Sequence, residues 1–266
     1  MKRRFLALSL GIVVLAVLAL LLWRHAHAPR SQAKPLFSVT PAAVTRLDAR
    51  WASGKQITLL RRPSGWQMTA PVQAPADPTR VKAFLAALDE PVSRSYAVAD
   101  VPLKGAGLAP PRLVLTVNRE KAELGRLNPT NGLRYMRLGP RVLLVADTLL
   151  PRLAAGPWQF ISTRLLPPGT RVREVRLEPG KATGSTQLIA AWQKARARHV
   201  GPVPSPAPAA LAHVRLTLAP LGGTLGYAVL SRHPLELTRP GSGLLYTFSP
   251  AATSRLLAAD ARTPGS

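Results

Sequence analysis

The 266-residue chain is 47% hydrophobic, which is enough to fill a substantial core in one large domain or two small ones. Its 36 lysines and arginines against 12 acidic residues give a formal charge of +24. This balance favours anionic partners, although biased codon usage in a GC-rich genome produces the same excess of arginine. The absence of cysteine excludes disulfides, thiolate nucleophiles, zinc–thiolate sites and iron–sulfur clusters.

The chain begins with a segment that predicts a membrane anchor. Three basic residues precede an uncharged apolar run over residues 5–23. At a rise of ~1.5 Å per residue this run is about 28 Å long, close to the hydrocarbon thickness of a bilayer. Ala26-His27-Ala28 has the form of a signal-peptide cleavage site, which is the alternative. The length of the apolar run, and Pro29 directly after that site, favour an uncleaved signal anchor over residues 1–27.

The anchor also predicts where the rest of the chain lies. A short basic amino terminus and a long following region favour a single-pass protein of the bacterial inner (cytoplasmic) membrane, with its bulk in the periplasm. Residues 28–43 are polar and contain proline, so we expect a tether there. A folded domain over residues 44–167 should follow it.

A hairpin and one helix are predicted at the start of this domain. Two β-rich runs, 56–61 and 66–69, flank the turn triplet Pro63-Ser64-Gly65. Asp77 suits a helix N-cap, and Pro78 suits the first helical position. The spacing i, i+3, i+4 and i+7 then predicts an amphipathic helix that packs on the sheet. Its apolar stripe consists of Val81, Phe84, Leu85 and Leu88.

A β-meander and a short helix are predicted next. The four strands cover residues 113–117, 122–127, 133–138 and 142–145. Asn131-Gly132 and Gly139-Pro140 are typical of the reversals between them. Asp147 is placed to cap a short helix through Leu149 and Leu153.

Residues 168–266 repeat this plan in a shortened, β-rich form with a proline-rich loop over residues 201–211. The pairs of similar segments are Arg46-Leu47-Asp48 with Arg176-Leu177-Glu178, Trp66-Gln67 with Trp192-Gln193, Val142 to Val145 with Leu245 to Phe248, and Arg152-Leu153 with Arg255-Leu256. Their shrinking spacing predicts loss of the helix and of some loops. The expected fold is therefore α+β: an N-terminal transmembrane helix followed by antiparallel β-meander sheets with few helices. Two degenerate copies are favoured over a separate second fold.

Three segments occur in a specific order, namely "ITLLRRPSGWQMTAPVQAPADPTRVKAFLAAL", "GAGLAPPRLVLTV" and "LGRLNPTNGLRYMRLGPRVLLVADTLL". In this order and spacing, residues 44–167 resemble the bacterial family known as domain of unknown function 4340. Lys104 to Gly107 departs from the family pattern, in which an aromatic residue precedes the Gly-Leu pair. The resemblance implies an envelope protein with one N-terminal membrane segment, in some cases associated with ABC-type export systems. It implies no catalytic residues.

The residues themselves show no pattern typical of catalysis. The five histidines lack metal-ligand spacing, and no GxSxG elbow occurs. The carboxylate pairs Asp89-Glu90 and Glu120/Glu123 suit solvated positions. We therefore expect no enzyme, no cofactor and no metal; a hydrolase whose residues converge only in the fold is a third alternative. Aromatic content of 5%, without interleaved basic residues, argues against nucleic-acid binding.

The candidate contacts with a partner or an anion are Arg126, Arg134, Arg137 and Arg141. Because side chains alternate along a strand, Arg134 and Arg137 should point to opposite faces and cannot form one basic stripe. This favours structural pairing or solvent exposure over a shared anion site.

The expected function is that of a membrane-anchored, non-catalytic accessory or scaffold protein of an envelope complex, with envelope proteins such as an ABC-type transporter as partners. The alternative is a binding module for an anionic envelope ligand, either phospholipid or lipopolysaccharide.

Overall fold

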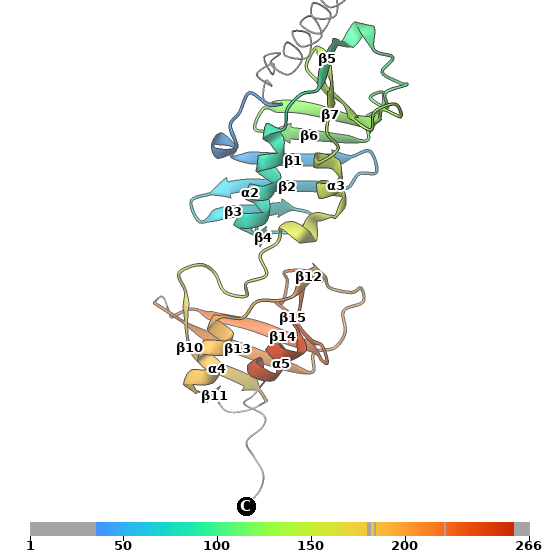
Figure 1. Cartoon of the computed structure of the whole chain (residues 1–266). Coiled ribbons are helices and arrows are strands. Elements are labelled where there is room, and N and C mark those ends of the chain that lie inside the picture. Colours follow the sequence, from blue (N-terminus) through green and yellow to red (C-terminus); the bar gives the residue numbers. More distant parts are fainter. Residues whose placement is uncertain (1–35, 180–181, 184, 221, 258–266) are drawn as a thin grey trace, which may run out of the picture.

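The computed structural model describes residues 36–179, 182–183, 185–220 and 222–257. They form two units, each with an antiparallel sheet, and Figure 1 shows one unit stacked on the other. We call residues 36–162 the first unit and residues 163–257 the second unit. The predicted α+β class, mainly β with few helices, is confirmed. The predicted anchor, residues 1–27, lies outside the described residues, among which no helix is long and apolar enough to cross a membrane.

The first unit has a nine-stranded sheet with the order β4-β3-β2-β1-β6-β7-β8-β9-β5. Its elements are η1 (Pro41–Ala43), β1 (Arg46–Trp51), β2 (Gln56–Arg62), β3 (Gly65–Ala70), β4 (Ala74–Pro75), α2 (Pro78–Ala86), η2 (Ala87–Asp89), β5 (Arg94–Ala97), η3 (Val98–Asp100), β6 (Leu113–Val117), β7 (Glu120–Leu127), β8 (Arg134–Leu138), β9 (Arg141–Val145), α3 (Leu149–Ala154) and η4 (Pro157–Phe160).

The second unit has a seven-stranded sheet with the order β11-β10-β13-β14-β15-β16-β12. Its elements are β10 (Arg171–Glu178), β11 (Ala182–Thr183), α4 (Thr186–Gln193), β12 (His199–Pro202), β13 (Ala212–Ala219), β14 (Thr224–Arg232), β15 (Leu235–Thr238), β16 (Leu244–Thr247) and α5 (Pro250–Leu256).

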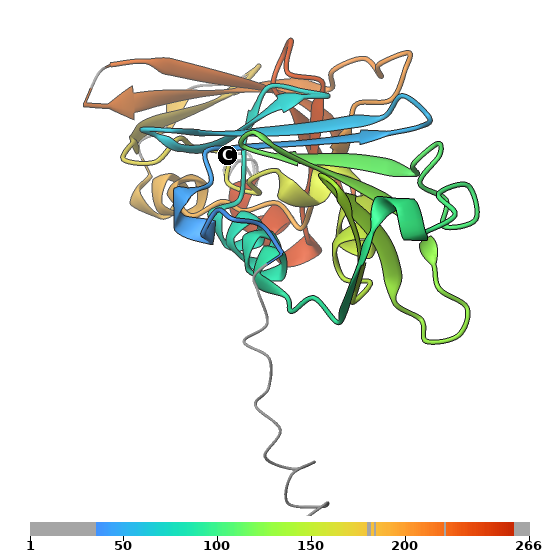
Figure 2. The same ribbon diagram turned by 90° about the horizontal axis from the view of Figure 1, so that it is seen from above.

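The two sheets share one order of elements. When β1 is matched with β10, the following strands β6 to β9 match β13 to β16, and β5 matches β12 at the edge. Helices α2 and α4 then occupy the same place in the chain, as do α3 and α5. Figure 2 shows that the helices of both units lie on the same side of the sheets. The second unit is shortened at one edge of its sheet, where the single strand β11 stands in place of β2, β3 and β4.

Two predictions about the second region are therefore wrong. Its helix is not lost, because α4 occupies the place of α2. Trp66-Gln67 and Trp192-Gln193 are not equivalent, because the first pair lies in β3 and the second in α4. Two identical residues do not determine whether they form a strand or a helix, so the Trp-Gln pair does not mark equivalent positions in the two units.

The predicted hairpin and helix of the first unit are confirmed. β2 and β3 pair across the turn at Gly65, which has a φ of 110°. The Asp77 side chain accepts hydrogen bonds from the backbone N–H groups of Thr79 and Arg80, so it caps α2 as expected. All four residues of the apolar stripe are buried.

The predicted tether, residues 28–43, is too long at its end. Leu36 and Phe37 are only 3% and 1% exposed and belong to the core. Asn118 fixes the chain that follows, because its side-chain amide donates to the carbonyl of Ala43 and its Oδ1 accepts from the N–H of Thr45. The folded part therefore includes residue 36, since burial of two large apolar side chains stabilises that segment.

The face of the first sheet opposite its helices is partly covered by the loop between η3 and β6. Ala106 and Leu108 of this loop are buried with Val142 in a small second cluster, which Tyr135 flanks. Beneath them β7 bulges at Gly125, where a Cβ atom would lie 2.2 Å from the carbonyl oxygen of Ala106. Glycine is required there because the loop backbone approaches the strand directly.

The two units are joined by residues 160–164, which we call the joining segment. On one side it extends the first sheet: Ala76 and Ile161 form an antiparallel bridge, and Ser162 N–H donates to the Pro75 carbonyl at 2.9 Å. This pairing covers the edge strand β4, whose outward backbone groups would otherwise lack partners.

On its other side the joining segment extends the second sheet. Arg164 and Arg196 form an antiparallel bridge, and Ala197 N–H donates to the Thr163 carbonyl at 2.9 Å. Residues 196–197 lead directly into the edge strand β12. The segment is thus hydrogen-bonded to both sheets, and one continuous core cluster includes residues of both units.

Aromatic side chains fix both ends of the junction. Phe160 packs edge-on against Phe84 of α2, with ring centroids 5.8 Å apart. In the second unit the hydroxyl of Tyr227 donates to the Leu165 carbonyl at 2.6 Å.

A buried tryptophan connects the two helices of the second unit. Trp192 is fully buried, and its Nε1 donates to the Leu256 carbonyl at 3.2 Å, which holds α4 against α5.

We expect Gly125→Ala to lower the free energy of unfolding by about 1–3 kcal/mol, because the new methyl group displaces the covering loop. Gly226→Ala is the control, since a Cβ atom at Gly226 would meet no atom within 4 Å. Urea denaturation of the full chain in detergent micelles, followed by tryptophan fluorescence, measures both. Equal stability of the two variants would show that the loop does not pack on β7.

Tyr227→Phe should lower the free energy of unfolding by about 1–3 kcal/mol, because the buried Leu165 carbonyl loses its donor. Tyr96→Phe, on the edge strand β5, should change it by less than about 0.5 kcal/mol. The same denaturation measurement compares them, and an unchanged Tyr227→Phe variant would contradict a structural role for this bond.

Candidate functional site

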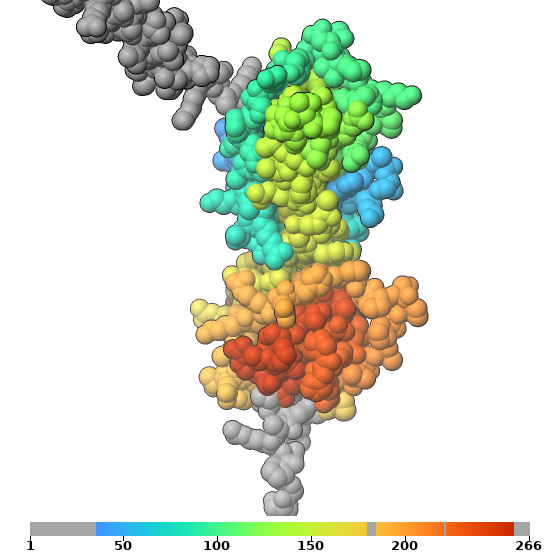
Figure 3. Space-filling model, turned by 45° about the vertical axis from the view of Figure 1, so that its right-hand side comes forward, coloured from blue at the N-terminus to red at the C-terminus, as the bar shows by residue number. Residues whose placement is uncertain are grey.

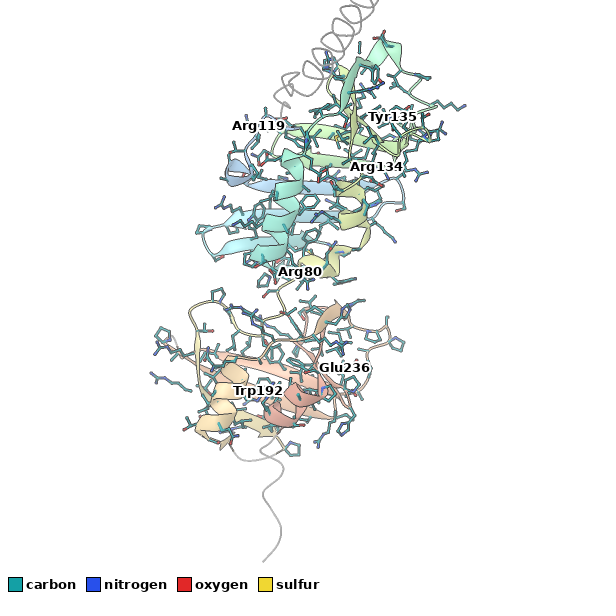
Figure 4. The ribbon with its side chains drawn as sticks, viewed as in Figure 1. Arg80, Arg119, Arg134, Tyr135, Trp192 and Glu236 are labelled. Carbon is teal, nitrogen blue, oxygen red and sulfur yellow. The ribbon has the colours of Figure 1, made fainter. Side chains whose placement is uncertain are left out.

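The first predicted contact residue, Arg134, is an internal clamp. Its side chain is 6% exposed, and its Nε and Nη2 donate to Asp147 at 2.5 and 2.8 Å in a bidentate pair. Its Nη1 donates to the Gly125 carbonyl at 2.6 Å, which satisfies a backbone group of the bulge. Figure 4 shows Arg134 within the first unit. With its donors used internally, this guanidinium does not present an anion site.

The prediction that Asp147 caps the helix α3 is wrong, because its carboxylate is occupied by the ion pair with Arg134. Thr148, not Asp147, is the N-cap residue of α3, and no side chain caps that helix. The Asp147 carboxylate instead pairs with Arg134 on the neighbouring strand β8. A charged partner attracts a carboxylate more strongly than backbone N–H groups do, so the ion pair replaces the cap.

Arg137 lies on the opposite face of β8, as alternation predicts. Its Nη1 is 3.4 Å from the Glu123 carboxylate, which also accepts from Lys121 at 2.7 Å. On β1 of the same face, Asp48 pairs with Arg50 at 2.8 Å. The carboxylates of this face thus neutralise neighbouring cations, whose side chains are exposed. Asp48 itself is buried and also accepts from Gln56 and Thr58.

Arg126 and Arg141 lie apart from these two. Arg126 is exposed on the bulge of β7, and its backbone N–H donates to the Ala106 carbonyl. Arg141 is exposed at the start of β9, where its Nε donates to the Ser95 hydroxyl at 2.5 Å. The four predicted arginines therefore do not converge on one site.

Titratable groups of the described residues form no arrangement typical of catalysis or metal binding. No three or more His, Asp or Glu side chains among them are grouped to hold a metal ion. His199, His213 and His233 are exposed on separate elements. Burial raises the pKa of the Tyr227 hydroxyl, as does the neighbouring Tyr246, while Arg239 opposes the rise. Tyr227 thus stays a neutral hydrogen-bond donor at ordinary pH.

A basic hollow lies between α4 and α5 of the second unit. It has a volume of about 560 Å³, and its lining includes Lys194, Arg196 and Arg255. Small side chains, Ala191 and Ala252 among them, keep it open. Figure 3 shows the surface of the second unit, with the atoms of α5 in red.

A second hollow of about 300 Å³ adjoins the first. The two share Lys194, Ala195 and Arg196, and the second adds Arg164 and the loop around Pro167. We call the two hollows together the helix groove. No acidic residue lines either of them.

The carboxylates of the described second unit lie elsewhere. They are Glu174, Glu178 and Glu236. Glu174 and Glu178 alternate with the core residues of β10 and pair with Arg176 and Arg215 at 3.6 and 3.2 Å. Glu236 lies between the buried Leu235 and Leu237 of β15. Alternation therefore places all three on the sheet face away from the helices.

Sequence reasoning missed the helix groove. One signal was present, the alternating cations of Lys194, Arg196 and Arg198 after Trp192. Arg164 and Arg255 are far from this run in the sequence, and only the joining segment and α5 bring them to it.

Fold and surfaces together define a two-unit α+β protein with a cationic groove on the helical face of its second unit. The chain belongs to the domain of unknown function 4340 family, whose model matches residues 66–198. The expected resemblance covers residues 44–167; the match instead starts in β3, at residue 66, and continues through the joining segment to residue 198, directly before β12. Searches of curated proteins and of solved structures found no match.

Arg134→Met should lower the free energy of unfolding by about 3 kcal/mol, because Asp147 and the Gly125 carbonyl lose a buried charged partner. Arg137→Met removes a more exposed pair and should cost less than about 1 kcal/mol. Thermal and urea unfolding of the full chain measure both variants. Similar losses for the two substitutions would contradict the assignment of Arg134 as an internal clamp.

Proposed function

We propose that this protein is a membrane-anchored accessory or scaffold protein of a bacterial envelope complex, with no catalysis of its own. The apolar run over residues 5–23 supports the anchor. Its length and the long region after it support a single-pass inner-membrane protein whose two units lie in the periplasm.

The observation that carries the scaffold function is the construction of the two units. They are copies of one plan, they share a core cluster, and the joining segment is hydrogen-bonded to β4 of the first sheet and to the chain that leads into β12 of the second. Most of the conspicuous polar interactions, such as that of Arg134 with Asp147, serve the fold. Such a body holds its surfaces in a fixed relation, which suits a protein that positions partners.

The proposal is tested by crosslinking the full-length protein in intact cells, followed by affinity purification and mass spectrometry. Recovery of other envelope proteins, such as a transporter permease, is the expected result. Recovery of the protein alone with bound phospholipid or lipopolysaccharide would instead support a binding module for an anionic envelope ligand.

Leu15→Arg combined with Leu18→Arg should prevent stable anchoring. Each arginine at the centre of the apolar run costs about 2.5–3.5 kcal/mol of insertion free energy. The variant should move from the membrane fraction to the soluble fraction and lose its crosslinks to membrane partners. Arg24→Lys keeps the flanking charge and serves as the control. Membrane retention of the double variant would refute the anchor.

A further inference from the structure

We propose that the helix groove binds an acidic segment of a partner protein through that segment's carboxylates. This inference rests on the proposed scaffold function and names the surface and the chemistry of the contact. The groove is defined by Lys194 and Arg196 where its two hollows meet, with Arg255 at one end and Arg164 at the other.

The lining of the groove is rich in hydrogen-bond donors. Arginine presents a planar fork that matches a carboxylate in a bidentate pair, and lysine adds a point charge. Arg255 donates from Nε to the Ala251 carbonyl of its own helix, which fixes its stem and leaves its terminal nitrogens for a ligand. The Ser249 hydroxyl at the N-cap of α5 accepts from the Ala252 N–H and keeps its own proton for a ligand, whereas the Ser254 hydroxyl donates to the Pro250 carbonyl.

Charge is segregated between the two faces of the second unit. The carboxylates of its described residues lie on the sheet face, where Glu174 and Glu178 pair with arginines. The helix face therefore keeps its positive potential, which attracts an anionic partner and orients it on approach.

The shape of the groove favours a peptide over a small anion. Pockets for small molecules enclose most of the ligand surface. The helix groove is instead an open trench of two connected hollows with alanines between the cations. A chain with carboxylates at intervals can occupy both hollows at once and meet Arg164 in one and Arg255 in the other.

The position of the groove argues against the bilayer as its ligand. The anchor precedes the first unit in the chain, and the groove lies on the second unit, which Figure 1 shows at the far side of the junction from β1. The groove is also held in shape internally, because the buried Trp192 of α4 donates to Leu256 of α5. It thus offers a preformed surface.

The test uses the full chain in nanodiscs of phosphatidylcholine and a fluorescein-labelled glutamate-rich peptide as probe, with anisotropy at low ionic strength. Lys194→Glu with Arg196→Glu should weaken binding at least about tenfold, since both charges reverse at the centre of the groove. The control, Lys55→Glu with Arg62→Glu, makes the same change in net charge on exposed positions of the first unit. Its affinity should fall by less than about threefold.

Equal weakening by both double variants would overturn the proposal, because the peptide would then sense only net charge. Unchanged binding by the groove variant would overturn it as well. Groove-dependent binding of phosphatidylglycerol vesicles without groove-dependent binding of the peptide would replace the acidic segment with a lipid headgroup. If the double reversal fails to fold, Lys194→Gln with Arg196→Gln gives the same comparison with smaller expected loss.

Crosslinking separates failure of this inference from failure of the scaffold function. If the unchanged protein recovers no envelope protein, the scaffold function fails whatever the peptide does. If it recovers a partner that the Lys194→Glu, Arg196→Glu variant recovers equally well, only the groove assignment fails.

Discussion

The backbone pairing of the joining segment is the interaction on which the arrangement of the molecule depends. A sheet edge presents unpaired N–H and C=O groups, and two sheets in one chain would expose four such edges. Residues 161–164 pair with β4 on one side and with the approach to β12 on the other. The outer edge of β4 and the chain leading into β12 thereby gain partners, and Figure 2 shows the helices of both units on the same side.

This constraint also creates the candidate site. Pairing of Arg164 with Arg196 brings the joining segment to the end of α4, so cations from separate parts of the chain border one groove. Because the connection to the first unit runs along this groove, a partner bound there lies beside the junction. The first unit has a smaller hollow on its helix side, lined by Arg80 and Arg152, but there both arginines donate to backbone carbonyls, of Gln159 and Ala83.

The high formal charge of the chain therefore has two different physical roles. In the first unit arginine serves structure, as the buried pair of Arg134 with Asp147 shows. In the second unit the carboxylates are held on the sheet face and the helical face stays cationic. Such a division suits the proposed scaffold, in which the first unit follows the proposed anchor and the second unit meets the partner.

The sequence by itself determined the local elements: the β2–β3 hairpin, the cap of α2 by Asp77, and the meander from β6 to β9. These depend on residues close in the chain, where turn chemistry and periodicity act. Only the tertiary structure decided that Asp147 pairs with Arg134, that Leu36 joins the core, and that α4 is retained. It also assembled the helix groove from Arg164, Lys194, Arg196 and Arg255. Those outcomes depend on contacts between distant segments, which the pairing of the sheets creates and local sequence patterns do not contain.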